Sequence, residues 1–124
     1  MNFLTDSSID VLLSKQKSFF AKNQTKSISF RRNALTNLLN NCLKYEKDIL
    51  KALQQDLRKS PEEAFLTEFS FVVSEIKLHL KNLNKWSASK RISTPLILRP
   101  SRSRIYYEPL GVNLVIAPWN YPFL

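Results

Sequence analysis

Apolar residues recur every three or four positions through about the first 90 residues, a spacing typical of helices that bury one face. The repeat predicts a first helix over residues 9–21, a second over residues 29–57, and a third from Ser60 to about Ala88. The polar run of residues 22–27 separates the first two helices. The second helix exceeds the usual upper length of about 20 residues. The first 90 or so residues are therefore predicted to be mainly helical.

The third helix has the clearest start signal in the sequence. Ser60 can accept a hydrogen bond from a backbone N–H of the first turn, and Pro61 fits the first helical position. Glu63 can reach back to the amide of Ser60. Only Arg58 and Lys59 separate this cap from the second helix. So short a connection predicts that the second and third helices are antiparallel neighbours.

The pattern changes after Lys90. Pro95 and Pro100 interrupt helix formation, and the β-branched and apolar residues around them favour extended backbone. The prediction is three short extended segments, over residues 96–98, 104–107 and 112–116. The last is almost continuously apolar, as in a strand covered on both faces of a parallel α/β sheet, and such a sheet needs more strands than this chain supplies.

Composition narrows the class of protein. A single glycine, where average usage gives roughly nine in this length, excludes a glycine-rich phosphate loop and favours helix. Cys42 is the only cysteine, so no internal disulfide can form, which suits a reducing compartment and indicates a cytoplasmic protein. No apolar run approaches the roughly 20 residues of a membrane span, and the first residues do not resemble a signal peptide.

Two residues with reactive side chains fit structural roles. Cys42 lies on the apolar face of the second helix, which predicts a small buried hydrophobic residue. His79 has no cysteine, histidine or carboxylate at metal-ligand spacing. We therefore expect His79 at the surface and no metal site.

The net charge of +9 permits an acidic partner, although charge bears on association and not on fold. The basic residues are scattered, and the densest group comprises Lys90, Arg91, Arg99, Arg102 and Arg104. One interpretation of the chain is therefore a self-contained basic helical module that binds partners or nucleic acid. The other, an enzyme, depends on the last residues of the chain.

The last residues of the chain carry the candidate chemistry. The apolar segment 112–116 runs directly into Ala117-Pro118-Trp119-Asn120-Tyr121-Pro122. Ligands of open α/β sheets bind just past the carboxyl ends of strands. Held between two prolines, the Asn120 amide is a pre-oriented hydrogen-bond donor. Residue type alone leaves the other interpretation open, with Asn120 as a turn residue and the two aromatic residues in a core.

Two motifs resemble the aldehyde dehydrogenase superfamily: Glu108-Pro109-Leu110-Gly111-Val112 and Ile116-Ala117-Pro118-Trp119-Asn120-Tyr121-Pro122. Upstream segments resemble its class 3 branch: Phe30-Arg31-Arg32, Ala52-Leu53, Asp56-Leu57-Arg58-Lys59-Ser60, Glu63-Ala64, Glu75-Ile76 and Thr94-Pro95. The resemblance implies a parent α/β fold with a Rossmann-like cofactor domain. Residues 1–124 are then a partial N-terminal region, helical over residues 1–90 and extended over residues 91–124, where the cofactor-binding sheet begins.

The resemblance also implies a reaction, the oxidation of an aldehyde to a carboxylate with NAD or NADP. In this family a cysteine thiolate attacks the carbonyl and hydride passes to the cofactor. Asn120 matches the asparagine that donates to the oxyanion. The strand end that lines the cofactor site is matched by Ile116, Ala117, Pro118 and Trp119. This motif fits only the enzyme interpretation, which the sequence favours over the basic module.

The same resemblance implies that residues 1–124 lack most of the catalytic residues of the family. The catalytic cysteine and general-base glutamate of the family lie further along, and Cys42 does not replace them. We expect the 124 residues to be inactive alone, as a truncated reading frame or a partial gene model. The full enzyme is expected to be a cytoplasmic homodimer that binds an aldehyde and no nucleic acid. Without its sheet, the segment 112–116 with Trp119, Tyr121 and Phe123 would form an exposed apolar patch that drives association.

Overall fold

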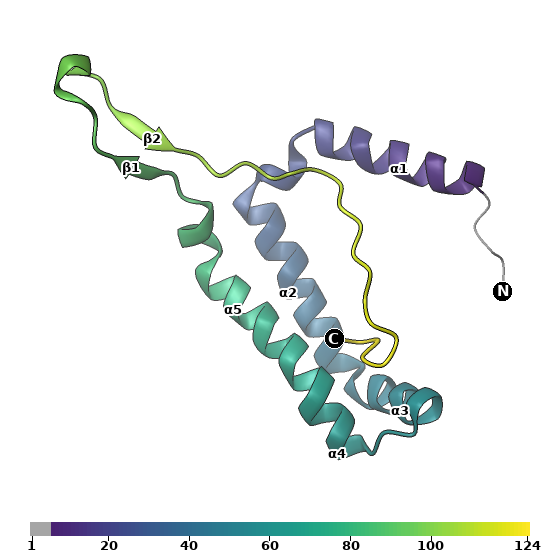
Figure 1. Cartoon of the computed structure of the whole chain (residues 1–124). Coiled ribbons are helices and arrows are strands. Elements are labelled where there is room, and N and C mark those ends of the chain that lie inside the picture. The colour runs from purple at the N-terminus through teal and green to yellow at the C-terminus, as the bar shows by residue number, and fades with distance from the viewer. Residues whose placement is uncertain (1–5) are drawn as a thin grey trace.

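The computed structural model describes residues 6–124, and Figure 1 shows the arrangement of their elements. Within these residues the helices are α1 (Asp6–Ala21), the 3-10 helix η1 (Gln24–Lys26), α2 (Ile28–Lys44), α3 (Glu46–Leu57), α4 (Pro61–Ala64), the π-helical segment η2 (Phe65–Phe69), α5 (Ser70–Ser87) and the 3-10 helix η3 (Leu96–Leu98). The strands are β1 (Lys90–Ile92) and β2 (Ser103–Ile105). The described chain is mainly helical with a short sheet, as predicted. None of its helices is both long and apolar enough to cross a membrane.

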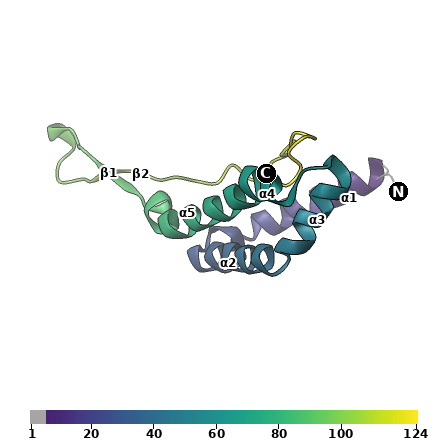
Figure 2. The same cartoon turned by 90° about the horizontal axis from the view of Figure 1, so that it is seen from below.

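The second and third predicted helices are antiparallel neighbours, as their short connection indicates. Figures 1 and 2 show α2 and α5 side by side and running in opposite directions. Two arginines of α2 join them through hydrogen bonds. Arg31 donates to the hydroxyl of Ser87 at 3.1 Å. Arg32 donates to the carbonyl of Leu80 and to the side-chain oxygen of Asn84, both at 3.1 Å.

A small apolar core lies between these helices. Its buried cluster is Cys42, Phe69, Val73 and Ile76, and the partly buried residues packed on it are Leu35, Leu39, Ile49, Leu50, Val72, Leu80 and Phe123. The burial of Cys42, which is 6% exposed, confirms the prediction of a small buried hydrophobic residue. The prediction for His79 is also confirmed, because it is exposed and lies edge-on to the ring of Trp86.

The predicted second helix is divided, which corrects the expectation of one continuous helix. α2 ends at Lys44 and α3 begins at Glu46, with Tyr45 between them at φ −102° and ψ 17°. Four of the five residues 44–48 are charged, so the apolar repeat that holds α2 against α5 is interrupted at this point. The repeat resumes in α3, and Ile49 packs against the core.

The two strands form an antiparallel hairpin that projects from the helical body (Figure 1). Arg91 of β1 lies opposite Arg104 of β2. The extended segment predicted at residues 104–107 is therefore confirmed at its start, because β2 ends at Ile105.

The expectation of extended backbone at residues 96–98 is wrong. These residues form η3 at the tip of the hairpin, where the N–H of Leu98 donates to the carbonyl of Pro95 at 3.0 Å. The chain must reverse direction between two short strands, and a tight helical turn achieves this where an extended segment does not. The tip is apolar and open, with Ile97 91% exposed.

The expectation of a strand at residues 112–116 is not met in this chain. Leu114, Val115 and Ile116 are 84–86% exposed, and the segment has no partner strand within residues 6–124. A strand is defined by hydrogen bonds to a neighbour, so an apolar run without one stays irregular. The segment instead passes from β2 along the helical body to α3 and α4 (Figure 1).

Candidate active site

The C-terminal motif forms a tight turn. The N–H of Tyr121 donates to the carbonyl of Pro118 at 3.3 Å, which makes Trp119 and Asn120 the central residues of a four-residue turn. Pro118 and Pro122 bound it on either side. Asn120 is exposed, and its side-chain amide has no hydrogen-bond partner among residues 6–124. The side-chain amide of Asn120 is therefore accessible from solvent, and its predicted role as a donor stays a prediction.

A buried ion pair holds this turn against the helices. The ammonium of Lys59 lies 2.6 Å from Oε1 of Glu68 and donates to the backbone carbonyl of Asn120 at 2.9 Å. It also lies 4.0 Å from the centre of the Tyr121 ring. The second oxygen of Glu68, Oε2, accepts from the N–H of Phe123 at 2.9 Å. The ion pair thus contacts Asn120 and Tyr121 of the turn through Lys59, and Phe123 just after the turn through Glu68.

Local backbone geometry places the two charged side chains. α3 ends at Leu57, and Arg58 caps it in the left-handed conformation, with φ 58°, so the chain turns sharply just before Lys59. The cap predicted at Ser60 then starts α4, because its hydroxyl accepts from the N–H of Glu63 at 3.1 Å. Glu68 follows in η2, where it is 0% exposed.

The π-helical geometry of η2 is accompanied by a side-chain hydrogen bond from Ser70, the residue that follows it. The N–H of Ser70 donates to the carbonyl of Phe65, five residues back, as in a π-helix. The carbonyl of Leu66 would take that N–H in an α-helix, and here it accepts from the hydroxyl of Ser70 at 3.1 Å. Segments of this kind are frequent at functional sites, which is consistent with Glu68 lying within one.

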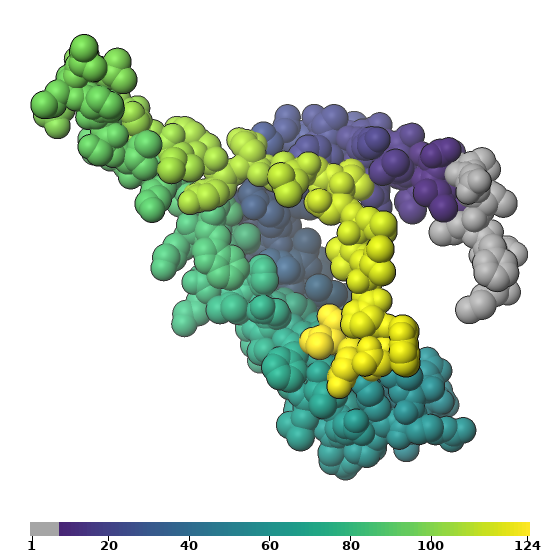
Figure 3. Space-filling view, viewed as in Figure 1, coloured from purple at the N-terminus to yellow at the C-terminus, as the bar shows by residue number. Residues whose placement is uncertain are grey.

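Aromatic packing completes the attachment of the turn. The rings of Phe123 and Phe69 stack, with centres 6.0 Å apart and planes 9° apart. In Figure 3 the C-terminal residues, in yellow, lie directly against the teal helices. The expectation that Phe123 belongs to an exposed patch is therefore wrong, because the ring packs against the core. Trp119, which is 84% exposed, fits that expectation, and Tyr121 at 37% is only partly exposed.

The residues predicted to line a cofactor site are the four that lead into the turn: Ile116, Ala117, Pro118 and Trp119. All four are exposed. The turn brings Pro118 and Trp119 next to Asn120, whereas Ile116 and Ala117 stay on the irregular segment before it. Among residues 6–124 there is no group of three or more His, Cys, Asp or Glu residues that could hold a metal ion.

Sequence analysis missed Lys59 and Glu68. A signal for one of them was available: Glu68 lies four residues after Ala64 and four before Val72, on the apolar side of the third helix. A carboxylate is almost never fully buried there unless it is paired. The identity of its partner, and its contact with the turn, depend on the tertiary fold.

The sequence matches the aldehyde dehydrogenase family over residues 3–124. It is 47% identical over 107 residues to 4,4'-diaponeurosporen-aldehyde dehydrogenase of Staphylococcus aureus (strain NCTC 8325 / PS 47), over 86% of this chain and 23% of that protein. It is 41% identical over 114 residues to aldehyde dehydrogenase family 3 member I1, chloroplastic, of Arabidopsis thaliana, over 92% of this chain and 21% of that one. The fold matches the substrate-bound state of Staphylococcus aureus AldH with a TM-score of 0.89 and 43% identity, over 99% of this chain and 26% of that chain.

The family model, the sequence relatives and the solved structure all point to one class of protein. This chain belongs to the aldehyde dehydrogenase family. The similarity to a family 3 member agrees with the class 3 motifs in the sequence. The chain spans between about a fifth and a quarter of the length of these relatives.

Proposed function

We propose that this chain is the N-terminal part of an enzyme that oxidises aldehydes to carboxylates with NAD or NADP. Asn120 is the donor to the oxyanion that forms on the aldehyde. The observation that carries this proposal is the open side-chain amide of Asn120 on a turn whose backbone is fixed by the Lys59–Glu68 pair. Family membership supports the reaction class.

The proposed role of Asn120 follows from where charge develops. When a thiolate adds to an aldehyde, negative charge moves onto the carbonyl oxygen, so a donor at that position stabilises the transition state more than the bound substrate. Such a donor is most effective when it does not have to reorganise, and the hydrogen bonds that hold the backbone at Asn120 support this role. One donor of this kind is typically worth about 10²–10³ in rate.

The proposed cofactor wall consists of Ile116, Ala117, Pro118 and Trp119. Ile116 and Trp119 are 85% and 84% exposed, so their apolar surfaces are open to an aromatic ring. The sequence has a single glycine and no glycine-rich loop, so these residues fit a wall of the site and not its phosphate cradle. When bound, the nicotinamide accepts the hydride that leaves the aldehyde carbon.

The 124 residues alone are proposed to be inactive. Nucleophilic attack needs an accessible thiolate, and Cys42, the only cysteine, lies in the apolar core. The purified chain should therefore reduce neither NAD nor NADP when an aldehyde is added. Cofactor reduction that disappears in a Cys42→Ala variant would contradict this proposal.

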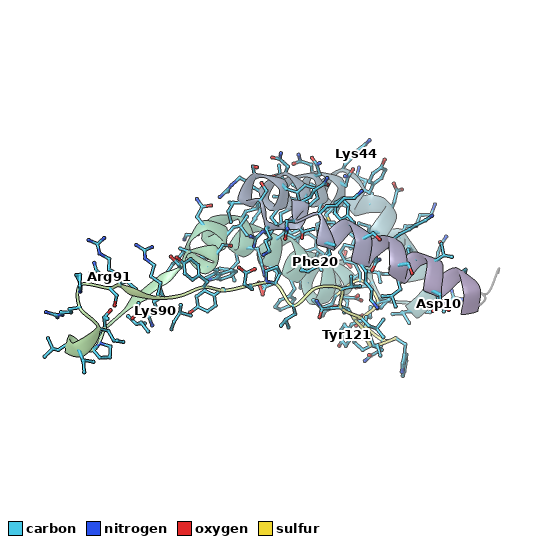
Figure 4. The ribbon with its side chains drawn as sticks, turned by 90° about the horizontal axis from the view of Figure 1, so that it is seen from above. Asp10, Phe20, Lys44, Lys90, Arg91 and Tyr121 are labelled. Carbon is cyan, nitrogen blue, oxygen red and sulfur yellow. The ribbon has the colours of Figure 1, made fainter. Side chains whose placement is uncertain are left out.

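The remaining parts of the proposal concern the whole enzyme. It is a cytoplasmic homodimer whose partner is a small aldehyde and not a nucleic acid, and residues 1–124 form part of its N-terminal region. Figure 4 shows Lys90 and Arg91 on the projecting hairpin, away from Tyr121 in the turn, so these basic residues lie outside the candidate site. Light scattering of the full-length enzyme tests the dimer.

The test of Asn120 uses the full-length enzyme that contains this chain. Asn120→Ala should lower kcat and kcat/KM together by about 10²–10³, because the interaction is made chiefly in the transition state. Asn120→Asp should lower them further, since it places an acceptor where a donor is needed. The matched control is Asn41→Ala, which removes an exposed amide that donates to the carbonyl of Asn37 on the same helix. A normal kcat in Asn120→Ala, measured where chemistry limits the rate, would remove Asn120 from the reaction.

A further inference from the structure

We propose that Lys59 and Glu68 are positioning residues that orient Asn120 for the reaction. This inference rests on the proposed function of Asn120. Neither residue touches the substrate. They act through the backbone of the turn, and their effect on the rate passes through the side-chain amide of Asn120.

The geometry of the contacts carries this inference. The Lys59 ammonium bonds to the carbonyl oxygen of Asn120 itself, at 2.9 Å. Glu68 bonds to the ammonium through Oε1 and to the N–H of Phe123 through Oε2. The turn and the residues just after it are therefore attached to one ion pair, at residues 120 and 123. A rotation of the Asn120 peptide would break the first of these bonds.

Burial of the pair indicates a positioning role beyond packing. The side chain of Glu68 is 0% exposed and that of Lys59 is 11% exposed. Replacing a buried ion pair with apolar residues of similar volume often leaves the stability of a protein unchanged or raises it. What an apolar pair does not provide is a directed bond to a particular carbonyl and a particular N–H. Those bonds set the orientation of the turn.

A second ion pair in the chain provides a matched control. Lys26 and Glu108 are also 2.6 Å apart, but their side chains are 44% and 65% exposed. This pair joins η1 to the segment before the turn, and within residues 6–124 neither side chain forms a hydrogen bond to residues 118–123. Removing it tests for a general effect of losing a lysine and an ion pair.

The kinetic test compares variants of the full-length enzyme that contains this chain. Lys59→Met alone leaves a buried carboxylate without its cation, so the decisive variant is the double change Lys59→Met with Glu68→Met, which removes both charges. We expect it to fold but to lose up to about 10²-fold in kcat, with little change in the KM for aldehyde, since small misplacements of a catalytic group cost that much. Lys26→Met should keep the kcat of the parent.

Adding Asn120→Ala to the double change separates positioning from a structural role. If the pair acts through Asn120, the triple variant should be no slower than Asn120→Ala alone. If the pair has only a structural role, the fold-losses in kcat of the double change and of Asn120→Ala should multiply in the triple variant. Multiplied losses, or a folded double variant with parental kcat, would overturn the inference. Normal activity of Asn120→Ala would instead refute the proposed function.

Hydrogen exchange on the 124-residue chain tests the attachment without any activity. The N–H of Phe123 bonds to a buried carboxylate, so its exchange should be at least about tenfold faster in the double variant, while Lys26→Met leaves it unchanged. Unchanged exchange at Phe123 in the double variant would show that the pair does not hold the turn. This result is independent of whether Asn120 takes part in catalysis.

Discussion

Replacing Lys59 with methionine removes one half of the buried ion pair and leaves the other half in place. The Nζ of Lys59 and Oε1 of Glu68 are 2.6 Å apart, and the Glu68 side chain is 0% exposed. After the change, the carboxylate keeps the N–H of Phe123 as its hydrogen-bond donor among residues 6–124. A buried charge without a counter-charge is costly, so the folded state should lose stability.

The size of the loss follows from burial. Removing one partner of a buried pair typically costs about 3–5 kcal/mol. The Lys59 side chain retains 11% exposure, so water reaches that end of the site and we expect a loss near the lower bound, about 3 kcal/mol. Removing the exposed partner in Lys26→Met should cost only about 0–1 kcal/mol. The double change Lys59→Met with Glu68→Met should recover most of the loss, because both charges are gone.

Urea unfolding followed by circular dichroism measures these differences. The urea concentration at the unfolding midpoint should be lower for Lys59→Met than for Lys26→Met, while the dependence of the free energy on urea concentration stays the same. Linear extrapolation to zero urea then gives the free energy of unfolding of each variant. If the free energy of unfolding of Lys59→Met lies within about 1 kcal/mol of the parent value, the reasoning that the pair is desolvated is refuted. A double variant as unstable as Lys59→Met would refute the assignment of the loss to the unpaired Glu68 carboxylate.

Two further changes test the core and the exposed segment. Phe69→Ala should lower the free energy of unfolding by about 3–5 kcal/mol in the same urea assay, because Phe69 is 2% exposed and stacks on Phe65 and Phe123; a loss below about 1 kcal/mol would contradict this. Ile116→Lys should leave that free energy within about 0.5 kcal/mol of the parent and reduce self-association in light scattering, because Ile116 is 85% exposed. Unchanged association would show that this segment does not drive it.

Local signals in the sequence predicted much of the helical body. The cap at Ser60 and the two-residue connection before it are sufficient to place a helix start and an antiparallel neighbour, since both depend on residues a few positions apart. The apolar repeat also identified Cys42 as a core residue. The turn at Asn120 was predictable for a similar reason, because two prolines four positions apart restrict the backbone on each side.

The features that sequence analysis missed depend on distant partners. The break at Tyr45 interrupts a helix whose amphipathic repeat continues on both sides. The charged residues around Tyr45 were the only local sign of this break. Residues 112–116 have the composition of a buried strand, but a strand forms only when a neighbour supplies hydrogen bonds. Lys59 meets Asn120 across 61 positions of sequence. No local pattern encodes such a contact.

The geometry of the turn does not depend on the strand before it. Residues 112–116 have no sheet partner within residues 6–124, yet the turn after them is closed by a backbone hydrogen bond and held by Lys59, Glu68 and Phe69. The arrangement matches that of a chain about four times longer, with a TM-score of 0.89 over 99% of this chain. Within residues 6–124, the contacts that hold the Asn120 backbone and Phe123 come from the helical region and not from a sheet. A sheet that pairs with residues 112–116 would order the strand that leads into the proposed cofactor wall, while the contacts with Lys59 and Glu68 already hold the turn that carries the proposed donor, Asn120.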